Sequence, residues 1–223
     1  MATTEIRTTE TEPSLRERKK AATRERIADV ARRLFLKRGF EAVTVAEIAQ
    51  EADVAEKTVF NYFPAKEDLF YGRLEEFEEE LLAAIRGREP GVSVIAAFRD
   101  FVMRSRGVLQ LADEEAATRQ LRDLNRVIGE SPALRARERE IFARYTDSLA
   151  ELIAKETAAK PAAIEPRVVA SALIDVHRIL IDIVRERTLA GDEASKIRRQ
   201  LRTQAKRAFD LLEDGLAGYG IKP

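Results

Sequence analysis

The 223-residue sequence contains no cysteine, and His177 is its only histidine. Without thiols, the chain can form neither a disulfide framework nor a thiolate metal site. Its apolar runs fall well short of the roughly 18 residues that identify a membrane-spanning helix, and its N-terminus lacks the apolar segment of a signal peptide. We therefore expect a cytoplasmic protein that makes no contact with a membrane.

The elements of common active sites are scarce as well. The sequence shows no glycine-rich loop that would cradle phosphate groups, no serine that can be paired with His177, and no repeated Glu-x-x-His pattern of a di-iron site. These absences argue against an enzyme and against a bound cofactor or metal ion. Two other classes remain open: a DNA-binding regulator, and a helical scaffold or dimerisation protein without specific DNA binding. Salt-dependent retardation of random duplex DNA would distinguish them.

What the chain does contain favours helices. Hydrophobic residues make up 45% of the sequence and charged residues 35%, and the abundance of Ala, Leu, Glu, Arg and Lys predicts an all-α protein. The formal net charge is zero, but residues 14–40 hold ten Lys or Arg against three Asp or Glu. This surplus of seven positive charges fits a surface that attracts phosphates. Taken alone, it also fits an ordinary solvated helix face.

Apolar periodicity and breaker residues divide the chain into about nine helices without a strand. Residues 1–13 are polar and predict a disordered tail, residues 14–64 a DNA-binding domain, and residues 65–223 a domain for effector binding and dimerisation. The expected helices cover about residues 14–38, 44–52, 56–62, 66–87, 92–111, 113–128, 132–159, 166–190 and 193–216.

The function is argued from residues 44–63, TVAEIAQEADVAEKTVFNYF. Thr44 and Glu47 form the pattern of a capping box that starts one helix. A three-residue turn at 53–55 then leads to a second short helix, and two short helices joined in this way predict a helix-turn-helix. The second helix has the length and polarity to enter a major groove. The polar side chains expected on its outer face are Lys57, Thr58, Asn61 and Tyr62.

Residues 24–70 resemble the TetR/AcrR family of transcription regulators. The resemblance lies in R-G-F at 38–40, T-V-A-E-I-A at 44–49, the aromatic pair Tyr62-Phe63, and P-A-K-E-D-L at 64–69. It implies a homodimer that binds an inverted-repeat operator in double-stranded DNA and responds to a small-molecule effector. The usual behaviour of the family is repression that ends when the effector binds, although the residues do not separate a repressor from an activator.

The resemblance also implies roles for individual residues. Thr44, Tyr62 and Lys66 would contact backbone phosphates, whereas Thr58 and Asn61 would lie nearest the bases. The chain departs from the family pattern at four positions: Asp53 replaces a turn glycine, Ala55 and Ala65 replace hydroxyl caps, and Phe60 replaces a tyrosine. Asp tolerates the left-handed conformation, and a lost cap typically costs about 1 kcal/mol. For Ala65, we expect acidic residues in the next helical turn to compensate through the helix dipole.

The helix expected at 166–190 carries apolar residues on more than one face, which predicts self-association. The helix expected at 193–216 would pair with it. Ala205 and Ala208 are small enough to permit close contact between helices of two protomers. In TetR-like proteins this helix pair forms the dimer interface.

An effector site is less distinct in the sequence, because its candidate residues also fit an ordinary core. We expect a small, largely apolar effector in a cavity behind the helix at 66–87, which would act as a continuous lever to the DNA-binding domain. Polar anchors in pockets of this kind are few, and Tyr145 or His177 would supply one. The candidate lining residues are Phe98, Phe101, Phe142, Tyr145 and His177.

Overall fold

The computed structural model describes residues 14–72, 74–104 and 115–216, so the N-terminal tail expected at 1–13 lies outside it. This part of the chain contains ten helices and no strand, which confirms the all-α class. None of the described helices is long and apolar enough to cross a bilayer. The helices are α1 (Leu15–Arg38), α2 (Val45–Glu51), α3 (Glu56–Tyr62), α4 (Asp68–Tyr71), α5 (Leu74–Arg86), α6 (Val94–Arg104), α7 (Glu115–Glu130), α8 (Pro132–Glu156), α9 (Glu165–Leu189) and α10 (Ala194–Leu216).

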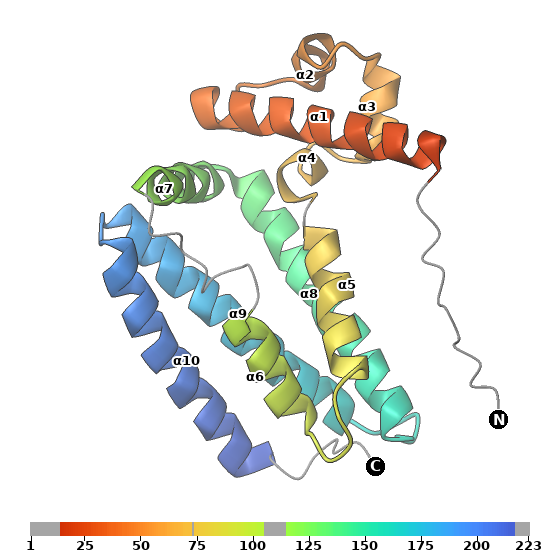
Figure 1. The fold of residues 1–223 in the computed structure, drawn as a ribbon, viewed down its shortest axis with the longest axis vertical. Coiled ribbons are helices and arrows are strands. Elements are labelled where there is room, and N and C mark those ends of the chain that lie inside the picture. The colour runs from red at the N-terminus through yellow and green to blue at the C-terminus, as the bar shows by residue number, and fades with distance from the viewer. Residues whose placement is uncertain (1–13, 73, 105–114, 217–223) are drawn as a thin grey trace, which may run out of the picture.

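The helices form two groups, which we call the head (α1–α4) and the bundle (α5–α10). Figure 1 shows the head lying across one end of the bundle, with α4 directly beneath α1. Within the bundle, α9 is central because it packs against α6, α7, α8 and α10. The head packs around the apolar face of α1, where Ile27, Ala31 and Phe35 are fully buried.

The start signals of the helix-turn-helix act as the sequence predicts. The Thr44 hydroxyl accepts a hydrogen bond from the Glu47 amide, and the Glu47 carboxylate accepts one from the Thr44 amide. Asp53 adopts a φ of 52° in the turn between α2 and α3. This left-handed conformation is the one for which glycine is usual, and Asp is among the residues that tolerate it. The two short helices therefore begin and end within a residue of the predicted positions.

The prediction of a single helix over residues 66–87 is wrong. The structure has two helices there, α4 and α5, and Gly72 is the C-cap of α4. Arg24 on α1 donates a hydrogen bond to the Gly72 carbonyl at 3.1 Å. A methyl group at Gly72 would lie 2.9 Å from Cε1 of Phe63, so only glycine fits there without displacing the ring. Close packing of the head against this turn therefore requires a residue with low helix propensity.

Elsewhere, helix ends differ modestly from expectation. Helix α7 runs to Glu130 rather than ending before Gly129, because Ser131 caps the next helix and accepts a hydrogen bond from the Leu134 amide. Pro132 then occupies the first turn of α8, as expected. The expected helix at 92–111 is described as α6 up to Arg104, and its remaining residues lie outside the described part of the chain.

Candidate nucleic-acid interface and effector cluster

Helix α3 presents two different faces. Val59 points into the head and is fully buried, whereas Lys57 and Asn61 are exposed; Thr58 and Tyr62 are half-buried. Ala55 occupies the N-cap of α3 and makes no side-chain hydrogen bond there. The sequence predicted this missing cap, because alanine replaces the usual hydroxyl residue. Lys57 and Asn61 are thus free to reach a ligand beyond the head surface.

Thr44 is exposed, but its polar groups are engaged by Glu47. The threonine hydroxyl lies 3.0 Å from one Glu47 carboxylate oxygen in addition to accepting from the Glu47 amide. Hydrogen bonds from the Thr44 amide and from Arg38 lower the pKa of Glu47 to about 2, so this carboxylate is charged at neutral pH. A phosphate contact at Thr44 would have to compete with a carboxylate that already holds the same hydroxyl.

Lys66 lies just before α4 and contacts the loop that follows α1. Its ammonium group donates a hydrogen bond to the Phe40 carbonyl at 2.7 Å and lies 4.2 Å from the centroid of the Phe40 ring. Partial burial lowers the pKa of Lys66. One of its three donors therefore stabilises the head, and any phosphate contact would use the others.

The positive surplus of residues 14–40 falls beside α3, the helix expected to read bases, which we call the recognition helix. Arg24, in the first half of α1, places its guanidinium 5.0 Å from the centroid of Phe63, the residue directly after α3. Figure 1 likewise shows α3 above the N-terminal half of α1. The charge count located this patch, but it did not single out its exposed members, which are Arg16, Arg18, Lys19, Lys20, Arg26, Arg33, Lys37 and Arg38.

Most of the predicted effector residues gather around one aromatic ring that the sequence analysis missed. Phe77 on α5 stacks on His177 at 4.9 Å between ring centroids and on Tyr145 at 5.7 Å, and it meets Phe101 edge-on at 5.3 Å. Phe142 packs edge-on against His177 and Tyr145. We call these five residues the aromatic cluster. It joins α5, α6, α8 and α9.

Phe98 lies elsewhere, because its ring partner is Phe209 on α10. The sequence shows that Phe98 and Phe77 lie on apolar faces, but it does not show which neighbouring helix covers each face. Phe101 also lines an open groove of about 720 Å³ between α5 and α6, together with residues such as Ala84 and Val92. Of the predicted effector residues, the structure thus brings together Phe101, Phe142, Tyr145 and His177.

His177 is the polar member of the cluster that stands out. It is 4% exposed, and its Nδ1 atom has no hydrogen-bond partner. Burial lowers the pKa of His177 to about 4, so the imidazole is neutral at physiological pH. An unpaired buried nitrogen is costly, and a ligand with a hydrogen-bonding group would satisfy it.

The structure corrects one expectation about the dimer surface. Ala205 is fully buried within the protomer, in line with Ile197, Leu201 and Phe209, so this face of α10 packs against its own bundle. Ala208 is half-buried. Large apolar side chains that remain exposed on α9 and α10 are Val168, Ile179, Leu189 and Leu211.

Comparisons with known proteins agree with this architecture. Residues 27–71, which include the helix-turn-helix, match the family of bacterial regulatory proteins named tetR. The chain is 28% identical over 159 residues to MftR of Mycobacterium tuberculosis, described as a transcriptional regulator of mycofactocin biosynthesis; this match covers 71% of the chain and 78% of MftR. It is 33% identical over 132 residues to the regulator TcmR of Streptomyces glaucescens, covering 57% of the chain and 58% of TcmR.

A solved structure extends the likeness over the bundle. NalD of Pseudomonas aeruginosa, the secondary repressor of the MexAB-OprM multidrug efflux pump, superimposes with a TM-score of 0.55 at 21% identity. The superposition covers 84% of this chain and 97% of NalD, so the two share a fold over most of their length. With its helix-turn-helix head, its helical bundle and these relatives, the chain is a DNA-binding transcription regulator whose residues 27–71 match the tetR family.

Proposed function

We propose that this regulator is a homodimeric repressor that binds an inverted-repeat operator through α3 and leaves it when a small, largely apolar effector binds. The observation that carries this proposal is the exposed face of α3, with Lys57 and Asn61, beside the cationic first half of α1. Cations on α1 would hold the DNA backbone, and α3 would read base edges in the major groove. The protein would act where bacterial operators lie, in the cytoplasm, without catalysis or a cofactor.

The predicted DNA-contacting side chains of the head differ in how far other residues of the protein already bind their polar groups. Asn61 and Thr58 would read bases, and the Tyr62 hydroxyl would contact a phosphate. Lys57 is exposed and can reach the backbone or a base. Lys66 and Thr44 would contribute less than the family resemblance implies, because Phe40 and Glu47 already hold their polar groups.

Substitutions on α3 are expected to separate base reading from backbone contact. With an operator selected from random duplexes, Asn61→Ala should reduce discrimination between operator and non-operator DNA by about tenfold or more, because a side-chain contact to a base edge is lost. Tyr62→Phe should instead weaken binding to all duplexes alike, because only a phosphate contact is removed. Fluorescence anisotropy across salt concentrations measures both effects. Lys160→Ala, an exposed change far from the head, is the control. If Asn61→Ala left affinity and preference unchanged, its base-reading role would be wrong.

The dimer would form through the outer faces of α9 and α10. Val168 and Ile179 on α9 are about half exposed, and Leu211 on α10 is 74% exposed. Apolar side chains that lie together on the outside of one helix pair favour association. The proposed interface is therefore made by these residues rather than by Ala205, whose side chain faces the protomer's own bundle.

Charge placed on this outer face is expected to separate the protomers without unfolding them. Ile179→Arg should convert a dimer at micromolar concentration into a folded monomer, because two-fold symmetry buries the new charge twice at one interface. Sedimentation and helical circular dichroism measure assembly and folding separately. Leu15→Arg, a similar change at an exposed leucine on α1, should leave the dimer intact. Ala205→Arg should abolish the fold itself. A dimer that persists with Ile179→Arg would rule out this surface.

The effector would bind at the aromatic cluster. Its rings are largely apolar, and one unpaired nitrogen, Nδ1 of His177, offers a directional contact, which is the usual composition of a small-molecule site. Phe77 connects the cluster to α5, the first helix after the head. An effector that moves Phe77 would therefore act close to the junction between head and bundle. Like NalD, described as a repressor of an efflux pump, the protein would switch off a target gene.

A further inference from the structure

The first two turns of α8 contact the head at three successive points. Ser131 donates a hydrogen bond from its hydroxyl to the Glu41 carboxylate at 2.6 Å. The Leu134 carbonyl accepts one from the Tyr71 hydroxyl at 3.2 Å. Nε and Nη2 of Arg137 both donate to Oδ1 of Asp68, at 3.0 and 2.6 Å. The three residues are spaced by three along α8, so one face of a single helix holds both α4 and the loop after α1.

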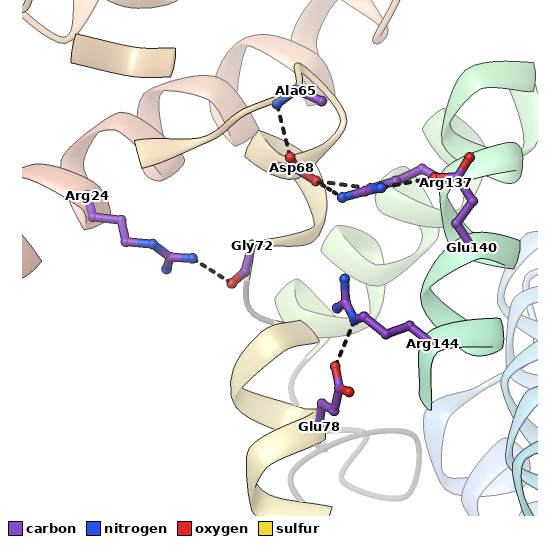
Figure 2. Close-up of polar contacts among 8 residues, drawn as sticks. All are labelled: Arg24, Ala65, Asp68, Gly72, Glu78, Arg137, Glu140 and Arg144. Atoms are coloured by element: carbon purple, nitrogen blue, oxygen red, sulfur yellow. Dashed lines mark hydrogen bonds and ion pairs between the residues drawn. The ribbon is translucent and has the colours of Figure 1, made fainter. Parts of the chain in front are cut away.

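Asp68 connects this helix to the segment that follows α3. Its second carboxylate oxygen accepts a hydrogen bond from the Ala65 amide at 3.0 Å, and Figure 2 shows the unbroken line from Ala65 through Asp68 to Arg137. On the other side, Glu140 binds the Arg137 guanidinium at 2.9 Å. Asp68 is 15% exposed and Arg137 29%, so this pair is better shielded from water than an ordinary surface ion pair.

The same helix also contacts α5 and the aromatic cluster. Arg144 donates to the Glu78 carboxylate at 2.9 Å, and the Ser148 hydroxyl donates to the other oxygen of that carboxylate at 2.6 Å. Figure 2 shows Arg144 and Glu78 below the Arg137 pair along α8. Tyr145 lies between Arg144 and Ser148 in the sequence and stacks on Phe77. Helix α8 thus touches the head at one end and the cluster in its middle.

We infer that Arg137 is a positioning residue, which fixes the orientation of the head on α8 and so sets the separation of the two recognition helices in the dimer. The chain between α4 and α5 is a poor candidate for this task, because the helix does not continue through Gly72. Two guanidinium donors converge on one oxygen of Asp68, and the Ala65 amide holds the other oxygen, so this contact restricts orientation more than a single hydrogen bond does. This inference rests on the proposed function and adds to it the element that links cluster and head.

Loss of the contact between Arg137 and Asp68 should weaken DNA binding only when both heads of a dimer bind one DNA molecule. The second head binds at an effective concentration that depends on how narrowly its position is restricted. Arg137→Met keeps the aliphatic stem but removes the fork. We expect it to lower affinity for the full operator about tenfold, a typical coupling between sites, while affinity for a duplex with one half-site changes less than about twofold.

Two further variants control for loss of charge and loss of fold. Asp68→Asn keeps an acceptor for the Ala65 amide but weakens the Arg137 pair, and should give the same selective loss. Arg167→Met removes the exposed ion pair between Arg167 and Asp147 on α8 and should change neither duplex affinity. Equal loss on both duplexes would make Arg137 a direct DNA contact, and no loss on either would make its pair with Asp68 irrelevant; each result would overturn the inference.

A measurement without DNA separates this inference from the proposed function. The chain has no cysteine, so Gln50→Cys, at an exposed site on α2, accepts one spin label per protomer. Electron–electron distance measurements on the dimer should give a narrow distribution with Arg137 and a clearly broader one with Arg137→Met, at unchanged helix content. A distribution of unchanged width would overturn the positioning role even if the protein binds DNA. A broadened one would support that role even if no operator is found.

Discussion

Replacing His177 by phenylalanine is expected to remove a loss of stability that the native protein suffers between about pH 6.5 and pH 4. Burial lowers the pKa of His177 from 6.5 to about 4, so in this window the unfolded chain binds a proton that the folded chain excludes. Proton uptake by the unfolded state lowers the free energy of unfolding as pH falls. The contribution of the neutral, buried His177 side chain to the free energy of unfolding is fully present above pH 6.5. It is lost progressively as pH falls to about 4.

The size of this effect follows from the shift. Each unit of pKa corresponds to about 1.4 kcal/mol, so the difference between wild type and His177→Phe should change by about 3 kcal/mol across the window. Phenylalanine keeps a flat ring against Phe77, and it eliminates the unpaired Nδ1 atom. Urea unfolding at several pH values gives the measurement, and subtracting the two curves cancels the titration of all other groups. A difference that stays constant from pH 7 to pH 4 would contradict a buried, neutral imidazole.

Replacing Gly72 by alanine is expected to destabilise the protein, although Gly-to-Ala changes in helical segments usually stabilise. The backbone at Gly72 has an ordinary helical φ of −58°, so alanine adds no backbone strain and gains up to about 1 kcal/mol of helix propensity. Its methyl group, however, would lie 2.9 Å from Cε1 of Phe63 and 3.0 Å from the Asp68 carbonyl oxygen. Overpacking of this kind costs about 1–3 kcal/mol. Because the Phe63 ring is buried and the second contact is with backbone, we expect a net loss.

The same change elsewhere in the chain supplies the control. Gly129, near the end of α7, has no atom within 4 Å of the position that its Cβ would take, so Gly129→Ala should raise stability by up to about 1 kcal/mol. Thermal unfolding of the two variants should therefore shift in opposite directions. Phe63 directly follows α3, so Gly72→Ala should also weaken operator binding. Stabilisation by both substitutions would show that the contact with Phe63 relaxes at little cost.

Local signals in the sequence were sufficient wherever their partners lie a few residues apart. The capping box of Thr44 and Glu47, the left-handed turn at Asp53 and the Ser131–Pro132 start of α8 all follow from interactions within one turn of the chain. These local features, with the motifs from Arg38 to Leu69, were enough to predict the helix-turn-helix and the family.

Phe77 was not predicted as a site residue, because the sequence pattern does not show which side chains pack against it. Phe77 shared an apolar stripe with its neighbours, and its stacking on His177, one hundred residues away, could not be seen from periodicity. The same limit misplaced Ala205, which lies on an apolar stripe that faces inward rather than towards a second protomer. Hydrophobic periodicity shows that a residue lies on a buried face, but it does not show which element covers that face.

The all-helical class, the order of the elements and the polar residues of α3 follow from the amino-acid sequence alone, because propensity, caps and turn residues act over a few positions. The break of the helix at Gly72 and the contact of α8 with the head through Arg137 and Asp68 arise from tertiary packing. Both features depend on atoms brought together from distant parts of the chain: Phe63 against Gly72, and a guanidinium 69 residues from its carboxylate. Such contacts exist only once the helices have packed, since packing alone fixes their distances.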